Sequence, residues 1–226
     1  MASAIRKEEL RRNVLAEWVG VAIGFVRAHR TALLAAAMAA ALVVIGSLAY
    51  RWYQDSRERE ASRSLAPTLA ALRSQNPQTP PDPVEGLKGL REVAQTFRGT
   101  RSAEEALLRL AYLQYDGQKY DEALSSLDEY VASYPRGRFR IEADLCRGYA
   151  LIGKQNLDGA ADIFSGIMAR DASNPLVGEA YMALARVREA QKKTDEALTV
   201  YGQVIEKFPQ TNWAQHALQR MNARKQ

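Results

Sequence analysis

The sequence predicts an all-α protein in which one membrane-spanning helix precedes a domain of stacked helical repeats. Two observations predict this fold class. Residues 31–50 carry no charged side chain. In the second half of the chain, small and apolar residues recur at an interval of 37 residues. Beyond residue 83 the apolar residues follow a helical period, and the sequence has no alternating strand pattern there.

Composition narrows the class of protein. The chain has 226 residues, enough for one or two domains, and its 47% hydrophobic and 25% charged residues are the balance of a folded protein. Residues 1–30 hold six basic and three acidic side chains, whereas residues 60–226 hold 22 basic and 21 acidic ones. A nucleic-acid-binding domain needs a basic face of its own. Charge-driven nucleic-acid binding is therefore not expected.

Residues 31–50 read TALLAAAMAAALVVIGSLAY. At about 1.5 Å per residue, a helix of this length covers about 30 Å, the thickness of a bilayer core. Arginines flank the run on both sides, and Trp52 and Tyr53 follow it, where aromatic rings favour the headgroup layer. We favour an uncleaved anchor over two alternatives. One is a buried Ala-rich core helix, and the other is a cleavable signal peptide with its small-x-small motif at residues 47–49.

Residues 1–30 form an amphipathic segment ahead of the span. Its apolar stripe consists of Leu10, Val14, Trp18, Val21, Ala22 and Phe25. The stripe predicts an interfacial helix, a docking face for another membrane protein, or a simple lead-in to the span. Gly20 and Gly24, together with the Ala-rich span, predict helix–helix association. Lys and Arg are balanced four to four near the span, but six to four when all of residues 1–30 count, which favours a cytoplasmic N-terminus.

Residues 51–83 are expected to form a juxtamembrane helix and a proline-rich break. The charged residues 51–63 extend the helix out of the membrane. Pro67 is expected to interrupt it, because proline has no N–H to donate, which leaves residues 65–72 as a short apolar helical stretch. The run NPQTPPDP at residues 76–83 predicts an extended, non-helical chain.

The repeat domain is expected to occupy residues 84–226, where several series of residues are spaced 37 apart. They are Ala123, Ala160 and Ala197; Leu127, Phe164 and Tyr201; Tyr130, Ile167 and Val204; Ala106, Ala143, Ala180 and Ala217; and Ala111, Gly148 and Ala185. Each unit reads as two antiparallel helices with small residues where they cross, and such units must stack to bury their apolar faces. Ser102-x-x-Glu105 predicts a capping box, and Asn174-Pro175 predicts a second helix N-terminus.

Two segments resemble the second helices of tetratricopeptide repeats: YDEALSSLDEYVASYP at residues 120–135 and TDEALTVYGQVIEKFP at residues 194–209. The resemblance implies a right-handed α-solenoid. Its longer turns would explain why the interval exceeds the usual repeat of about 34 residues. Residues 157–172 form a weaker middle unit without the closing proline. A degenerate earlier unit is expected at about 62–98, and a C-terminal capping helix at residues 213–224.

The order of these parts is similar to that of the ancillary SecYEG translocon subunit family, which shares its repeat domain with the periplasmic cell-division coordinator proteins. The resemblance implies a single-pass protein of the bacterial inner membrane, with the N-terminus cytoplasmic and the repeat domain periplasmic. The partners it implies are translocon subunits, chaperones or unfolded clients. The alternative function is a structural adaptor for cell-envelope assembly or cell division.

We predict no catalytic, metal-binding or cofactor-binding constellation. His29 and His216 lie at opposite ends of the chain. Cys146 is the only cysteine, and it is expected to be a buried thiol too far from the N-terminus to carry a lipid. Residues 148–155 imitate the phosphate-binding pattern GxxxxGK[ST], but Gln155 replaces the hydroxyl and a helix precedes the pattern where a strand is required. The chain is therefore expected to be a binding protein and not an enzyme.

In tetratricopeptide repeats, positions two, five, nine and twelve of each first helix tend to face the groove. The resemblance maps these positions to an apolar and aromatic floor of Leu108, Tyr112, Tyr115, Leu145, Tyr149, Ile152, Met182 and Arg186, with Glu105, Glu142, Glu179 and Glu189 along one rim. Such a groove is expected to bind an extended or partly unfolded apolar segment. The alternative is that Tyr112, Tyr149 and Met182 pack against the chain's own helices.

Overall fold

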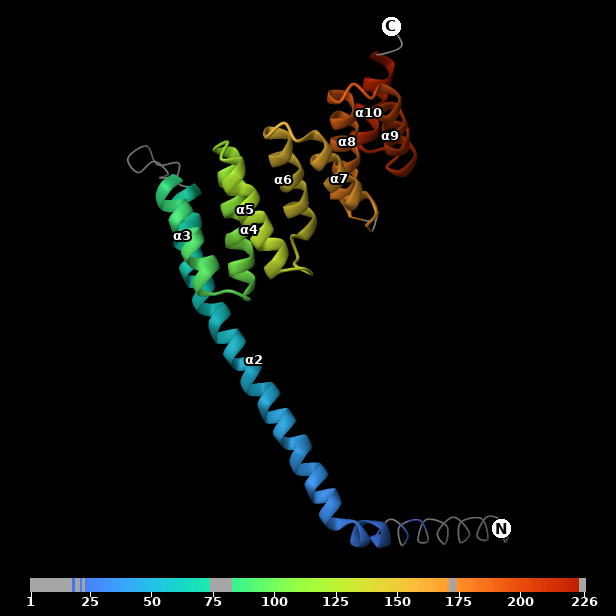
Figure 1. The fold of residues 1–226 in the computed structure, drawn as a ribbon. Coiled ribbons are helices and arrows are strands. Elements are labelled where there is room, and N and C mark those ends of the chain that lie inside the picture. The colour runs from blue at the N-terminus through green and yellow to red at the C-terminus, as the bar shows by residue number, and fades with distance from the viewer. Residues whose placement is uncertain (1–17, 19–20, 22, 74–82, 171–173, 224–226) are drawn as a thin grey trace, which may run out of the picture. The chain divides into compact units, whose positions relative to one another are not determined.

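The structure is a computed structural model that describes Trp18, Val21 and residues 23–73, 83–170 and 174–223. The chain divides into two compact units, Met1–Asp55 and Ser56–Gln226, which we describe separately. The helix α2 (Arg30–Arg73) contributes to both of them (Figure 1). All the described regular structure is helical, and the expected all-α fold class is confirmed.

In the first unit, α2 is the one described helix that is long and apolar enough to cross a membrane. Its most apolar window of 18 residues has a mean hydropathy of 2.4, and none of that window is buried in the structure. Large apolar side chains such as Leu42 and Val43 are exposed. A core helix would be covered by the rest of the protein, so the alternative of a buried Ala-rich core helix is not supported. Gly20 and three of the six stripe residues (Leu10, Val14 and Ala22) lie outside the described residues, whereas a Cβ on Gly24 would meet open space.

The expected interruption at Pro67 is wrong, because α2 continues through Pro67 to Arg73. Pro67 is exposed, whereas Leu65 is buried on the side that packs against the next helix. The backbone carbonyl that loses its partner at a proline can therefore bind water. The stretch that was expected to stand alone is thus the last part of α2. It belongs to the second unit.

The second unit consists of the end of α2 and a series of shorter helices. These are α3 (Pro83–Thr96), α4 (Arg101–Asp116), α5 (Tyr120–Ser133), α6 (Arg140–Gly153), α7 (Leu157–Met168), α8 (Pro175–Ala190), α9 (Thr194–Lys207) and α10 (Asn212–Ala223). Each helix packs against the next one, and α4, α6, α8 and α10 also contact one another in sequence. In the described residues, the backbones of α5, α7 and α9 do not come as close to one another.

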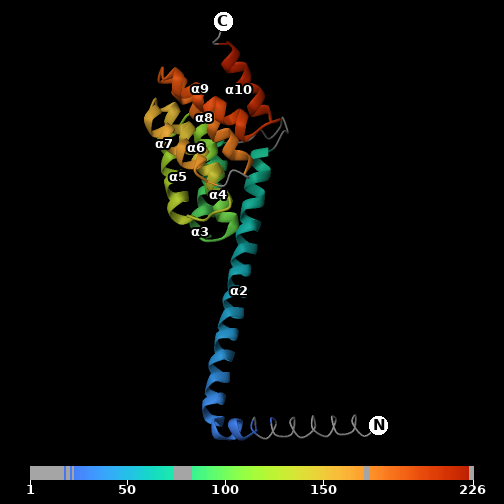
Figure 2. The ribbon, with the colours of Figure 1, turned by 90° about the vertical axis from the view of Figure 1, so that its right-hand side faces the viewer.

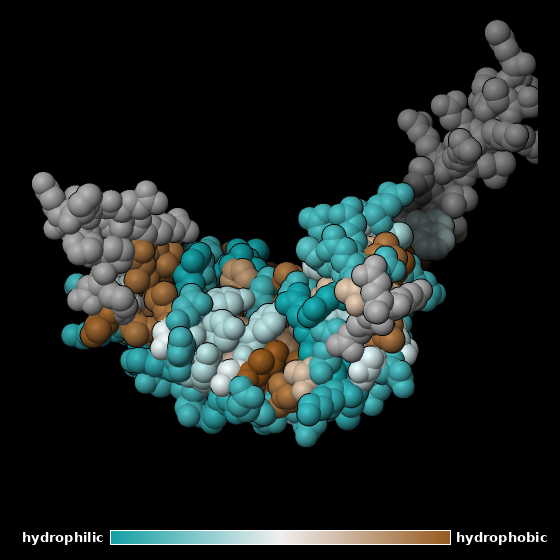
Figure 3. Space-filling model, turned by 90° about the horizontal axis from the view of Figure 1, so that it is seen from above, coloured by the Kyte–Doolittle hydropathy of each residue, from teal (hydrophilic) through white to brown (hydrophobic). Residues whose placement is uncertain are grey.

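These contacts place α4, α6, α8 and α10 on the inner side of a curved stack and α5, α7 and α9 on its outer side. Figure 2 shows α5, α7 and α9 on one flank of the unit and α10 on the other. Seen from above in Figure 3, the unit bends around a hollow. Its core consists of two buried apolar clusters, one around Leu90 and Tyr130 and the other around Phe164 and Tyr201.

A further helix pair lies where the sequence predicts a degenerate earlier unit, at about residues 62–98. The outer-layer helices α3, α5, α7 and α9 begin 37 residues apart, at Pro83, Tyr120, Leu157 and Thr194. At the same interval, Gly86 corresponds to Ala123 and Leu90 corresponds to Leu127. All four residues are buried. The end of α2 is therefore the first helix of an additional unit whose second helix is α3.

Small residues lie where paired helices cross, as expected. Ala111 and Ala185 are fully buried, and a Cβ on Gly148 of α6 would come within 2.5 Å of the Phe164 ring of α7. Gly86 of α3 has the same role, because the Leu72 side chain of α2 occupies the space that a Cβ on Gly86 would need. Contacts this close allow no larger residue without movement of the neighbour.

The two expected helix starts have different outcomes. Asn174 caps α8 through its side-chain oxygen, which accepts from the Leu176 N–H at 3.0 Å, and Pro175 follows in the first turn. The expected capping box at Ser102 is wrong. The cap of α4 is Thr100, whose hydroxyl accepts from the Ala103 N–H at 3.1 Å. Ser102 lies inside the first turn and bonds instead to Glu58 of α2.

Candidate protein-binding groove

The inner side of the stack brings together side chains from α4, α6 and α8, and the groove residues differ in how far they reach its surface. Leu108 and Leu145 are each 6% exposed and Met182 is 3% exposed, so they support the floor from below. Tyr115, Tyr149 and Ile152 are partly buried, Tyr112 is 37% exposed, and Arg186 is exposed. Tyr112 and Arg186 are thus the predicted groove residues most open to a partner.

The two tyrosines at equivalent positions in α4 and α6 link neighbouring helices. The Tyr112 hydroxyl donates to the Glu142 backbone carbonyl of α6 at 3.4 Å, and the Tyr149 hydroxyl donates to the Glu179 carboxylate of α8. Burial and this hydrogen bond raise the pKa of Tyr149, and the same carboxylate accepts from Trp213 Nε1 of α10 at 3.2 Å. Glu179 therefore connects three helices of the inner layer.

These bonds distinguish the two tyrosines. The Tyr149 ring also packs edge-on against Phe164, with the centroids 5.4 Å apart, so its contacts within the domain are extensive. The Tyr112 hydroxyl makes a longer, exposed bond, and burial raises its pKa to about 12. With 37% of its surface exposed, Tyr112 is still accessible to a partner. Tyr112 has the features of a binding residue, and Tyr149 has those of a structural one.

A pocket of about 330 Å³ opens beside Tyr112, between the end of α2 and α4. Its lining residues are Leu69, Leu72, Arg109, Tyr112 and Leu113. Arg109 is fixed at the rim by an ion pair with Glu105 of the same helix at 2.7 Å. The pocket is within the size range of small-ligand sites in proteins and has the expected mixture of apolar walls and few polar groups.

The groove predicted from the sequence did not include Leu69, Leu72 or Arg109. The two leucines fall in the degenerate unit expected at about residues 62–98, but the predicted repeat domain began only at residue 84. A usable signal was present, because Gly86, Leu90 and Val93 lie 37 residues before Ala123, Leu127 and Tyr130. That series identifies α3 as the second helix of a unit and requires a first helix just before it.

The segment that imitates a phosphate-binding loop has a helical structure. Gly148 lies inside α6 against Phe164, and Lys154 caps the end of α6 and bonds to Asp121 of α5. Both residues are therefore accounted for by helix packing. Cys146 is buried, and its burial raises the pKa of the thiol to about 12, which makes it an unreactive structural residue.

Helix pairs of this length, stacked into a curve with small residues at the crossings, define a tetratricopeptide-repeat solenoid, a class of fold that exposes an extended inner surface. Residues 82–226 match the family model described as YfiO, outer membrane lipoprotein, and the chain belongs to that family. The match begins immediately before α3 and continues to the end of the chain.

Two further comparisons show what else the chain is similar to. The ancillary SecYEG translocon subunit of Neisseria gonorrhoeae is 28% identical over 181 residues, which is 79% of this chain and 82% of that protein. Among solved structures, MamA 41-end from Desulfovibrio magneticus RS-1 is similar, with a TM-score of 0.56, 19% identity, and coverage of 73% of this chain and 85% of that one. A MamA RS-1 double mutant gives a TM-score of 0.55 at the same identity. The structural neighbours show the fold alone.

Proposed function

We propose that this chain is a membrane-anchored protein-binding scaffold that works beside the protein-translocation machinery of the bacterial inner membrane. Residues 31–50 anchor it, the N-terminus is cytoplasmic, and the repeat domain is periplasmic. The similarity to a translocon subunit along most of both chains supports the setting. The exposed apolar face of α2 supports the anchor.

The observation that carries the binding role is the apolar pocket beside Tyr112. Leu69 and Leu72 reach it from α2, and Leu113 and Tyr112 reach it from α4. An extended segment lying along the inner surface inserts an apolar side chain there, while the ion pair of Arg109 and Glu105 provides polar contacts at the rim. Such a site recognises apolar character without a strict sequence, as translocated clients or chaperones require.

A structural adaptor in envelope assembly or division is the second candidate function. It uses the same inner surface for a fixed partner, and the repeat architecture suits both functions. In both cases the chain acts by binding, without catalysis. The two functions differ in the identity of the partner and in the range of segments that compete for the pocket.

The test is purification of the full chain from gently solubilised membranes, followed by identification of the proteins that remain bound. Recovery of translocon subunits with the wild-type chain supports the proposal. Tyr112→Ala is then expected to lose clients or chaperones while it keeps the translocon subunits, if these are bound through the anchor. Recovery of envelope-assembly or division proteins without any translocon subunit would favour the adaptor.

A further inference from the structure

One edge of the second unit is rich in arginine. It is formed by the connections α3–α4 and α5–α6, which lie together at the lower side of the unit in Figure 1. Residues 97–101 and 134–140 carry five arginines and no acidic residue. Arg98, Arg101, Arg136 and Arg138 are exposed, and we call these four residues the arginine edge. Within the described part of the chain, none of them forms an ion pair with a carboxylate.

Three carboxylates near the arginine edge are engaged elsewhere. Glu58 accepts from the N-terminal N–H groups of α4, and Glu104 is buried and accepts from the Tyr130 hydroxyl at 2.6 Å. Asp144 is buried and pairs with Arg140 and Arg170. The positive charge of the four exposed guanidinium groups is therefore not neutralised by the domain itself.

The arginine edge lies next to the beginning of the second unit. The Arg57 guanidinium of α2 donates to the Thr96 carbonyl at 2.8 Å, and Glu58 binds the first turn of α4. Both contacts attach the beginning of the second unit to the α3–α4 connection. Only five residues separate Tyr50 from Ser56, and a chain of this length spans at most about 22 Å. The α9–α10 connection, residues 208–211, carries no charge.

We propose that the arginine edge binds the anionic phospholipid headgroups of the membrane in which residues 31–50 are anchored. Guanidinium groups bind phosphate through two parallel hydrogen bonds, and basic residues next to a membrane span are attracted to anionic lipid within a Debye length. The contact orients the repeat domain on the membrane surface. The inference rests on the proposed anchoring of residues 31–50.

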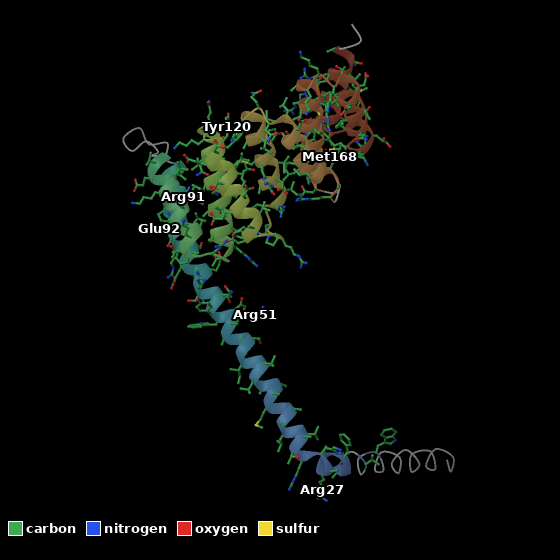
Figure 4. All side chains as sticks on the ribbon, viewed as in Figure 1. Arg27, Arg51, Arg91, Glu92, Tyr120 and Met168 are labelled. Carbon is green, nitrogen blue, oxygen red and sulfur yellow. The ribbon has the colours of Figure 1, made fainter. Side chains whose placement is uncertain are left out.

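The experiment uses the full chain in nanodiscs of two compositions, phosphatidylcholine alone and phosphatidylcholine with 30% phosphatidylglycerol. Both contain a trace of lipid with a nitroxide on its headgroup. A fluorophore is attached to a cysteine at Ala132, an exposed position near the end of α5. Cys146 is buried and stays unlabelled. A second preparation carries the label at Ser125, about 10 Å further along the same helix toward Tyr120 and the opposite edge (Figure 4).

We expect phosphatidylglycerol to increase nitroxide quenching at position 132 at least twofold, with a smaller change at position 125. The increase disappears in about 0.5 M salt, because screening weakens the attraction. It also disappears in R98Q/R101Q/R136Q/R138Q and falls to about half in R101Q/R136Q. The double variant is the control for misfolding of the quadruple variant, because Arg101 and Arg136 make no side-chain bond within the described residues. The matched control, K119Q/K154Q/K192Q/K193Q, removes four charges at the helix turns of the opposite edge and keeps the full increase.

Equal quenching in the two lipid compositions would overturn the proposal, and so would an increase that persists in the quadruple arginine variant. Binding of the arginine edge to an acidic protein instead of lipid would also give equal quenching in these protein-free membranes. Failure of the chain to incorporate into the discs would overturn the anchoring itself. Incorporation with equal quenching would overturn only the lipid contact.

Discussion

The Glu58 carboxylate accepts hydrogen bonds from both the hydroxyl and the backbone N–H of Ser102, at 2.7 and 3.2 Å. Its other oxygen accepts from the Arg101 N–H at 2.6 Å. A residue of α2 thus satisfies N–H groups that α4 leaves free at its first turn, and its charge is favourable at the positive end of that helix. This contact fixes the end of α2, with Leu69 and Leu72, against the α4 side of the pocket.

Glu58→Ala is therefore expected to lower the free energy of unfolding of the repeat domain by about 2 kcal/mol, the typical contribution of a charged hydrogen-bonding group at a helix N-terminus. It should also weaken ligand binding at the pocket, because α2 is no longer fixed there. Denaturant unfolding of the full chain in detergent measures the first effect. Glu60→Ala, an exposed neighbour, serves as the control and should change stability by less than about 0.5 kcal/mol.

Gly148→Ala tests the close crossing of α6 and α7. The added Cβ would lie 2.5 Å from two carbons of the Phe164 ring, so we expect a loss of about 1–3 kcal/mol from overpacking. Gly202→Ala in α9 is the matched control, because a Cβ there meets nothing within 4 Å. It should stabilise the helix by about 0.5–1 kcal/mol. Equal effects of the two substitutions would mean that the crossing is not tight.

The turns α4–α5, α6–α7 and α8–α9 each hold one residue in the left-handed region. Gln118, Gln155 and Lys192 have φ of 59°, 61° and 62° and lie 37 residues apart. Gln155→Gly should stabilise the domain by about 0.5–1 kcal/mol because glycine has no steric penalty there, whereas Gln155→Val should destabilise it. Thermal unfolding followed by circular dichroism measures both changes. A loss of stability in the glycine variant would contradict the backbone conformation described for this turn.

Alkaline pH is expected to destabilise the domain through Cys146. The pKa of the thiol rises from 9.0 to about 12 on burial, so between these values the unfolded chain loses its proton while the folded chain keeps it. Stability contributed by the neutral thiol is complete below pH 9 and falls as the pH rises toward 12. Cys146→Ala removes this part of the dependence, so its unfolding free energy should fall less steeply above pH 9 than that of the wild type. Parallel curves would contradict the assignment.

Tyr112 and Tyr149 are expected to respond differently to mutation. Tyr149→Phe removes the donor that binds the Glu179 carboxylate and should cost about 1–3 kcal/mol of stability. Tyr112→Phe should leave both stability and binding close to wild type, whereas Tyr112→Ala should weaken binding of an apolar peptide about tenfold without unfolding. Peptide titration and denaturant unfolding on the same samples separate the two effects. Unfolding of Tyr112→Ala would show that its role is structural.

The sequence was sufficient for the repeat itself, because packing imposes its own pattern on it. A position such as Gly148 must be small wherever two helices cross, and a position such as Phe164 must be large to fill the space between them. These requirements recur in each unit, so the 37-residue interval is visible without a structure. Helix starts that depend on a local side chain, such as Asn174, are equally visible.

Contacts between distant residues were not predictable in the same way. Ser102 looked like a cap, but the hydroxyl of its neighbour Thr100 competes for that position, and Glu58 binds Ser102 from 44 residues away. Pro67 was expected to break α2, because the packing of Leu65 and its neighbours against α3 was unknown. The pocket was missed for the same reason, since two of its five lining residues come from that last part of α2.

Photo-crosslinking from position 112 tests the central claim most directly. A photoreactive amino acid replaces Tyr112 in one full-length chain and Ser125, an exposed residue of the outer layer, in another, and both are irradiated in native membranes while a secreted protein is being translocated. The account predicts crosslinks from position 112 to the translocated chain or to a chaperone bound to it, and few from position 125. Equal crosslinking from the two positions, or none from position 112, would contradict it.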